Sequence, residues 1–97
     1  MDRQETIERV GSVAAELRRR FGIAELALFG SVARGDAGEA SDVDFLVEFQ
    51  GRADFDRYMD LKFFLEDLLG RRVDLVTRKA LKPRLRPSVD AEAVRVA

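Results

Sequence analysis

The 97-residue sequence contains no cysteine, no histidine and no tryptophan, and it has only two prolines. Without cysteine and histidine, the chain has no disulfide, no zinc-finger ligand set, no Ser-His-Asp triad and no imidazole for acid–base chemistry. A metal ion bound by this chain must therefore have oxygen ligands, which suit hard cations such as Mg²⁺ and Mn²⁺.

A strong charge of one sign and long apolar runs are also missing. Seventeen Lys and Arg against eighteen Asp and Glu give a net charge of -1, so bulk electrostatics favours neither nucleic acid nor an anionic membrane surface. No apolar run approaches the roughly 20 residues of a membrane span, and no signal peptide is evident at the N-terminus. We therefore expect a cytoplasmic protein with no membrane association and no direct nucleic-acid binding.

The composition and length are those of one folded domain. With 46% hydrophobic and 36% charged residues, the chain can bury a single core, and its length leaves no room for a second substrate domain. No linker or internal repeat divides it, so we expect one domain over residues 1–97.

Apolar periodicity and turn residues predict alternating helices and strands. The predicted helices cover residues 6–21, 31–35 (a single turn) and 55–69, and a last helix is predicted to begin within residues 80–88. The predicted strands cover residues 25–29, 43–49 and 73–76. This order implies a small mixed β-sheet flanked by helices, an α/β (α+β) sandwich with too few strands for a dinucleotide-binding fold.

The helix predicted over 55–69 carries more apolar residues than one narrow face can hold. Asp54 and Gly70 stand at its N-cap and C-cap positions. At about 100° per residue, its nine apolar residues cover well over half of the helix circumference. One face can pack on the sheet while another leaves apolar surface exposed, which is typical of a partner-binding helix.

Three aspartates stand out because of their places in the predicted strands. Asp42 and Asp44 lie at the start of one strand, on one face and about 6.5 to 7 Å apart at Cα. Asp74 lies in the next, otherwise apolar strand, where an unpaired charge is costly. If the two strands are neighbours, the three carboxylates can converge on one divalent ion or on a pair of ions.

A structural interpretation of the same aspartates also stays open. Acidic residues are common at strand starts and in turns. On this interpretation Asp42 is a cap or turn residue and Asp44 faces outward. Asp74 then forms an ion pair with one of the neighbouring arginines, which are Arg71, Arg72 and Arg78.

Gly30 and Ser31 follow the first predicted strand and precede the helical turn. Glycine allows close backbone approach to a ligand, a serine hydroxyl can bond phosphate oxygens, and free N–H groups at a helix start favour an anion. A phosphate cradle and a simple turn are both consistent with this pair.

The combination of these motifs carries a family resemblance. Gly30-Ser31, ten further residues, Asp42-x-Asp44 and then Asp74 on another strand resemble the signature of the DNA polymerase β-like nucleotidyltransferase superfamily. The stretch from Gly30 to Asp44 is especially similar to the minimal nucleotidyltransferase (MNT) family of prokaryotes, the antitoxin partners of HEPN-domain toxins. The resemblance extends over nearly the whole chain and implies the nucleotidyltransferase fold.

The resemblance implies a role for each residue of these motifs. Gly30 and Ser31 would hold the triphosphate of an incoming nucleotide, and Asp42 and Asp44 would ligate Mg²⁺ or Mn²⁺. Asp74 would complete the metal site and act as, or orient, the base that activates the acceptor hydroxyl.

Two further residues of the matched stretch have supporting roles in this interpretation. Arg34 would lie near the phosphates or pair with a catalytic aspartate. Ser41 would fix the loop ahead of Asp42.

The implied reaction is Mg²⁺-dependent transfer of AMP from ATP to a hydroxyl of a HEPN-type toxin, with tyrosine as the expected acceptor. The toxin would be encoded next to this protein, which would act as its antitoxin in a hetero-oligomer. A binding-only antitoxin that masks its partner is the first alternative, and the apolar helix over 55–69 favours it. A small-molecule nucleotidyltransferase of the kind that adenylylates aminoglycosides is the second, although those enzymes carry additional C-terminal structure.

A basic stretch includes the third predicted strand and continues beyond it. Residues 71–86 contain seven Lys and Arg against Asp74 alone. The stretch is either a solvated edge or a surface for an acidic partner, nucleotide phosphates or RNA. We rank the acidic partner first among these ligands because few aromatic residues are available for stacking bases.

Overall fold

The computed structural model describes residues 2–38 and 40–97. Its strands are β1 (Ile23–Phe29), β2 (Val43–Phe49), β3 (Val73–Thr77) and β4 (Val94–Arg95). They form one mixed sheet in the order β3-β2-β1-β4. β1 runs antiparallel to β2 and β4, whereas β2 and β3 are parallel. The predicted aspartate cluster required the strands that carry Asp44 and Asp74 to be neighbours, and β2 and β3 are adjacent in the sheet.

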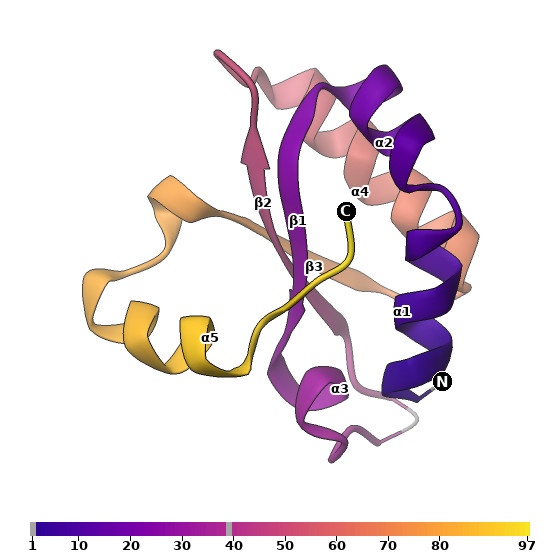
Figure 1. The fold of residues 1–97 in the computed structure, drawn as a ribbon, viewed down its shortest axis with the longest axis vertical. Coiled ribbons are helices and arrows are strands. Elements are labelled where there is room, and N and C mark those ends of the chain that lie inside the picture. The colour runs from indigo at the N-terminus through magenta and orange to yellow at the C-terminus, as the bar shows by residue number, and fades with distance from the viewer. Residues whose placement is uncertain (1, 39) are drawn as a thin grey trace.

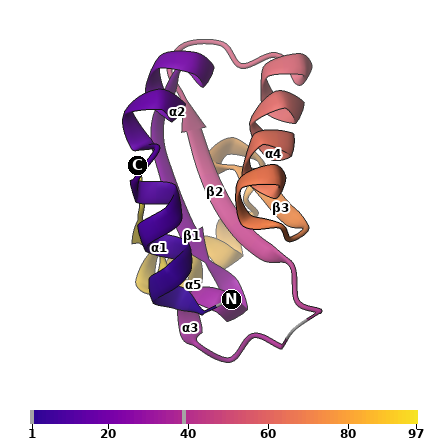
Figure 2. The same ribbon diagram turned by 90° about the vertical axis from the view of Figure 1, so that its right-hand side faces the viewer.

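The helices lie on both sides of this sheet. They are α1 (Arg3–Gly11), α2 (Ala14–Phe21), α3 (Gly30–Arg34), α4 (Phe55–Leu69) and α5 (Arg86–Glu92), with 3₁₀ turns η1 (Arg78–Ala80) and η2 (Pro83–Leu85). Helices α1, α2 and α4 cover one face, and the η1–α5 segment lies on the other side (Figures 1 and 2). None of the helices within residues 2–38 and 40–97 is long and apolar enough to cross a membrane.

Two groups of buried side chains hold these layers together. The main core lies between the sheet and helices α1, α2 and α4, and its fully buried members include Leu17, Leu61 and Leu65. A smaller cluster of Leu46, Leu81 and Val89 fixes the η1–α5 segment against the opposite face. The predicted α/β sandwich is confirmed, with unequal packing on its two faces.

Helix α4 has the bounds that the sequence predicts. Asp54 is its N-cap and accepts a hydrogen bond from the Arg57 N–H at 2.7 Å. Gly70 ends the helix in the left-handed conformation at φ 65°. Phe55 is 73% exposed and Phe63 51% exposed, so the prediction of apolar surface on this helix is confirmed.

The single helix predicted over residues 6–21 is wrong, because α1 ends at Gly11 and α2 begins at Ala14. The Ser12 N–H donates to the carbonyl of Glu8, and the Ser12 hydroxyl donates to the carbonyl of Arg9 at 2.7 Å. Residues on both sides of the break still pack into the main core, so the apolar periodicity conceals it.

The last helix begins within residues 80–88, as predicted, but only near the end of this segment. Pro83 opens η2 and Pro87 lies in the first turn of α5, positions where the missing N–H and the fixed φ of proline suit a helix start. The helix therefore begins at Arg86 and extends to Glu92. The two-residue strand β4 that follows pairs Arg95 with Ala27 of β1 and was not predicted.

Candidate functional site

The parallel register of β2 and β3 pairs Asp44 directly with Asp74. Both residues line a hollow of about 650 Å³ together with Gly30, Ser31 and Arg34. We call this hollow the aspartate cleft. Its opposite side is formed by the segment from Ala80 to Glu92. Its volume lies within the roughly 300 to 1,000 Å³ of small-molecule sites.

The environment of Asp44 penalises its negative charge. Asp44 is half-buried, and burial, followed by the charges of Asp74 and Asp42, raises its pKa to about 6. Like charges on neighbouring carboxylates disfavour ionisation of both. A divalent cation between them would remove this repulsion, so the donor chemistry of the pair fits an oxygen-ligated metal ion.

Asp74 differs from the sequence expectation in one respect. Its side chain is exposed at the cleft, because strand alternation turns it to the face opposite the buried Val73 and Leu75. The argument from a buried charge therefore does not apply. The alternative of an ion pair with Arg71, Arg72 or Arg78 is also wrong for the described residues. Arg72 contacts Asp42 and Arg78 contacts Asp90, whereas Arg71 donates to the backbone carbonyl of Ser41.

Asp42 lies at the margin of this arrangement. It is exposed, precedes β2, and its Oδ1 lies 3.2 Å from Nε of Arg72. It is not among the residues that line the aspartate cleft. Within residues 2–38 and 40–97, no three acidic side chains already surround a single ion position. The structure thus brings Asp44 and Asp74 together, while Asp42 is paired with Arg72 outside the cleft lining.

Gly30 is required by the position of Asp44. Its φ of 77° lies in the left-handed region, and an added Cβ would lie 2.0 Å from Oδ2 of Asp44. Any side chain here would displace that carboxylate. The sequence predicts that a ligand approaches the Gly30 backbone closely, but in the structure the Asp44 carboxylate occupies that place. The Gly30 N–H donates a hydrogen bond to Oε1 of Glu92 at 2.9 Å.

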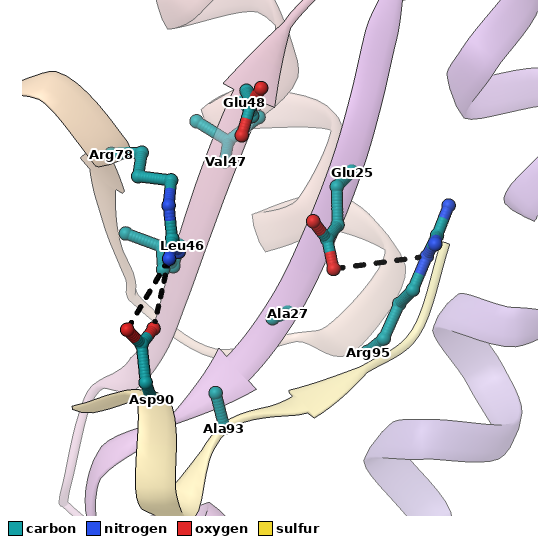
Figure 3. A pocket seen from close by; sticks show the side chains of 9 residues that line it. All are labelled: Glu25, Ala27, Leu46, Val47, Glu48, Arg78, Asp90, Ala93 and Arg95. Atoms are coloured by element: carbon teal, nitrogen blue, oxygen red, sulfur yellow. Dashed lines mark hydrogen bonds and ion pairs between the residues drawn. The ribbon is translucent and has the colours of Figure 1, made fainter. Parts of the chain in front are cut away.

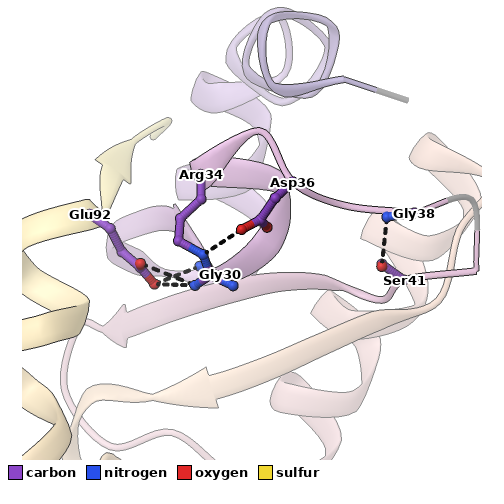
Figure 4. A network of polar contacts seen from close by, with 6 residues as sticks. All are labelled: Gly30, Arg34, Asp36, Gly38, Ser41 and Glu92. Carbon is purple, nitrogen blue, oxygen red and sulfur yellow. Dashed lines mark hydrogen bonds and ion pairs between the residues drawn. The ribbon is translucent and has the colours of Figure 1, made fainter.

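Arg34 forms a network with two acidic residues rather than with a catalytic aspartate. Its guanidinium lies 3.2 Å from Oε2 of Glu92 and 3.2 Å from Oδ2 of Asp36 (Figure 4). The hydrogen bonds to Glu92 and then to Asp36 raise the pKa of Arg34. Sequence reasoning missed Glu92 because it lies 62 residues from Gly30 and outside the motifs.

Ser41 holds the loop that leads into β2. Its Oγ accepts a hydrogen bond from the Gly38 N–H at 3.0 Å, and Figure 4 shows the two residues facing each other across the turn. Arg71 donates to the Ser41 carbonyl at 2.6 Å. These bonds hold the backbone immediately before Asp42. Holding this loop is the supporting role that the resemblance implies for Ser41.

A second hollow lies over β1, β2 and β4 and contains none of the predicted site residues (Figure 3). Most of its charged side chains form ion pairs, with Arg78 3.1 Å from Asp90 and Arg95 4.0 Å from Glu25. Because these exposed charges largely offset one another, this hollow lacks the concentrated charge of the aspartate cleft.

The chain is similar to known proteins over nearly its whole length. The profile of the nucleotidyltransferase domain family matches residues 10–96. The protein adenylyltransferase MntA of Thermococcus cleftensis is 43% identical over 95 residues, which cover 94% of this chain and 96% of that protein.

Solved structures give the same fold. A structure described as a candidate minimal nucleotidyltransferase superposes with a TM-score of 0.83 at 44% identity, covering 97% of this chain and 95% of its own. A chain in the complex of a tri-AMPylated Shewanella oneidensis HEPN toxin with an MNT antitoxin superposes with a TM-score of 0.67. At 20% identity over 94% of this chain and 71% of that chain, this second likeness extends to the fold alone.

Proposed function

This chain belongs to the nucleotidyltransferase domain family, among its minimal members, and we propose on this premise that its aspartate cleft transfers AMP from ATP to a hydroxyl of a partner protein. The observation that carries the proposal is the register of β2 and β3, which sets Asp44 beside Asp74. Gly30 lies directly against the first of these carboxylates. The pair thus lies next to the turn that carries the Ser31 hydroxyl.

The acidic residues of the cleft would hold Mg²⁺ or Mn²⁺. Asp44 and Asp74 are the two ligands already side by side, and Asp42 would join them on leaving Arg72. The ion would neutralise charge on the triphosphate and lower the pKa of the attacking hydroxyl. Burial and the neighbouring negative charges raise the pKa of Asp44 to about 6, and a bound cation would favour its charged form.

The remaining residues of the cleft orient the reactants. The Ser31 hydroxyl donates to a phosphate oxygen, and Lys82, on the opposite wall, adds a cation near the phosphates. The acceptor oxygen attacks the α-phosphorus, and the bond to the bridging oxygen breaks to release pyrophosphate. Asp74 accepts the proton of the acceptor hydroxyl as the new phosphodiester forms.

The acceptor is expected to come from another protein. Asp74 is exposed at the cleft, so a side chain of a second protein can reach the proposed base. A relative 43% identical to this chain is named a protein adenylyltransferase. A chain of the same fold occurs in the complex of a tri-AMPylated HEPN toxin with an MNT antitoxin. We therefore propose a tyrosine of a neighbouring HEPN-type toxin as the acceptor and antitoxin activity as the result.

The test is to incubate the protein and its genomic neighbour with ATP and Mg²⁺ and to record the intact mass of both chains. We expect one or more AMP units on the neighbour with the native protein and none with the Asp42→Ala/Asp44→Ala variant. Glu8→Ala, which removes an exposed carboxylate of α1 outside both the cleft and α4, is the control, and this variant should modify the neighbour as fully as the native protein does. AMP addition by the double variant would contradict the assignment.

One observation favours a second candidate, a masking antitoxin that binds without catalysis. Phe55 and Phe63 expose apolar surface on α4, on the side of the sheet opposite the η1–α5 segment. Neutralisation of the toxin in cells by Asp42→Ala/Asp44→Ala, at unchanged protein level, would favour masking.

Turnover of small hydroxyl compounds in place of the neighbouring protein as acceptor would instead support the small-molecule alternative.

A further inference from the structure

Glu92 joins the C-terminal segment to both ends of α3. Its Oε1 accepts a hydrogen bond from the Gly30 N–H at 2.9 Å, and its Oε2 accepts one from Nη1 of Arg34 at 3.2 Å. Gly30 and Arg34 are the first and last residues of this helix. One carboxylate from the end of α5 thus bonds both the backbone of the first residue of α3 and the side chain of its last residue, which reaches back toward Gly30 (Figure 4).

Helix α3 has little to hold it in place by itself. It is five residues long, and its N-cap residue Phe29 makes no side-chain cap hydrogen bond. Helices this short are not stable alone, and the N–H groups of their first turn need partners from elsewhere. Glu92 supplies such a partner and places a negative charge at the positive end of the helix.

The contact also decides which groups remain for the nucleotide. The Gly30 N–H is engaged by Glu92, and the Arg34 guanidinium is shared between Glu92 and Asp36. Phosphate contacts from this turn therefore fall to Ser31. Glu92 is a third carboxylate of the cleft lining, and the ion pair with Arg34 offsets part of its charge.

We propose that Glu92 is a positioning residue, whose carboxylate holds the Gly30–Arg34 turn so that Ser31 keeps its place relative to Asp44. The inference rests on the proposed nucleotidyl transfer and adds to it a residue outside the signature motifs. Asp44 and Asp74 are held by the sheet, so loss of Glu92 should weaken nucleotide binding more than it slows the chemical step.

The experiment compares Glu92→Ala and Glu92→Gln with the matched control Asp90→Ala. Asp90 is an exposed carboxylate of the same helix, and its ion pair is with Arg78 of η1. The measurements are KM for ATP and kcat with the neighbouring protein as acceptor. A third measurement, amide hydrogen exchange at Gly30, does not depend on activity.

We expect Glu92→Ala to raise KM for ATP at least tenfold with a smaller change in kcat, and to speed Gly30 exchange at least tenfold. Glu92→Gln should recover part of both effects because its amide oxygen can still accept from the Gly30 N–H. Asp90→Ala should leave both near the native values.

Two results would overturn the proposal. Equal effects of Asp90→Ala and Glu92→Ala would show that general docking of α5 is what matters. Unchanged or tighter ATP binding by Glu92→Ala would show that the carboxylate does not position the turn for nucleotide. Absence of AMP transfer by the native protein would refute the proposed function instead, and Gly30 exchange would still decide whether Glu92 holds the turn.

Discussion

Replacing Asp44 with asparagine tests the electrostatics of the cleft through the stability of the fold. The substitution keeps the size of the side chain and removes its charge. The folded-state pKa of Asp44 is about 6, above the ordinary value of 3.8. Between these two values the folded state binds more protons than the unfolded state, so the free energy of unfolding falls as pH rises through this window. The Asp44→Asn variant should not show this fall.

The size of the effect follows from the shift. A rise from 3.8 to about 6, at about 1.4 kcal/mol per pKa unit, corresponds to about 3 kcal/mol. Because Asp44 is only half-buried, solvent screens part of this energy, and we expect about 1 to 2 kcal/mol. The variant should exceed the native protein in unfolding free energy by this amount at pH 8 and match it near pH 4.

Urea denaturation at pH 4, 6 and 8 measures this difference, with Asp56→Asn as a control for the loss of an exposed aspartate. Addition of Mg²⁺ at pH 8 should stabilise the native protein and leave Asp44→Asn unchanged, because an ion that binds only the folded state raises its stability. A variant less stable than the native protein at pH 8, or a difference that is the same at every pH, would refute this reasoning.

Three further substitutions separate packing from function. Leu65→Ala should lower the unfolding free energy by about 2 to 5 kcal/mol in urea, because Leu65 is fully buried; a loss below about 1 kcal/mol would place it outside the core. Gly30→Ala should lower both the melting temperature and AMP transfer, because its Cβ would lie 2.0 Å from Oδ2 of Asp44; native activity would contradict the close packing. Phe63→Ser should change the unfolding free energy by less than about 0.5 kcal/mol, because the side chain is 51% exposed. Co-purification with the neighbouring protein then tests α4 as its docking surface, and unchanged recovery would exclude Phe63 from the contact.

Elements with strong local signals were predictable from the sequence. Helix α4 and strand β2 have the predicted bounds, because the Asp54 cap, the Gly70 end and a compact run of apolar and aromatic residues are each encoded within a few residues. The break between α1 and α2 was not predictable, since both helices keep their apolar residues toward one core.

The candidate site was predictable in its residue types but not in its geometry. The parallel pairing of β2 with β3 joins segments far apart in the chain. From the sequence, Asp74 could therefore be placed beside Asp44 only if these two strands were assumed to be neighbours. The ion pair of Asp42 with Arg72 and the hydrogen bond from Gly30 to Glu92 also depend on tertiary contacts. The ion pair with Arg72 keeps Asp42, a predicted metal ligand, outside the cleft lining. The hydrogen bond from Gly30 adds Glu92, a residue that no motif contains, to the site.

Transfer of label from ATP tests the central claim most directly. The protein and its neighbour are incubated with Mg²⁺ and with ATP labelled at either the α- or the γ-phosphorus. Attack at the α-phosphorus predicts that the neighbour retains the α-label, while the γ-label leaves in pyrophosphate. Retention of the γ-label, or of neither label, would contradict nucleotidyl transfer by the aspartate cleft.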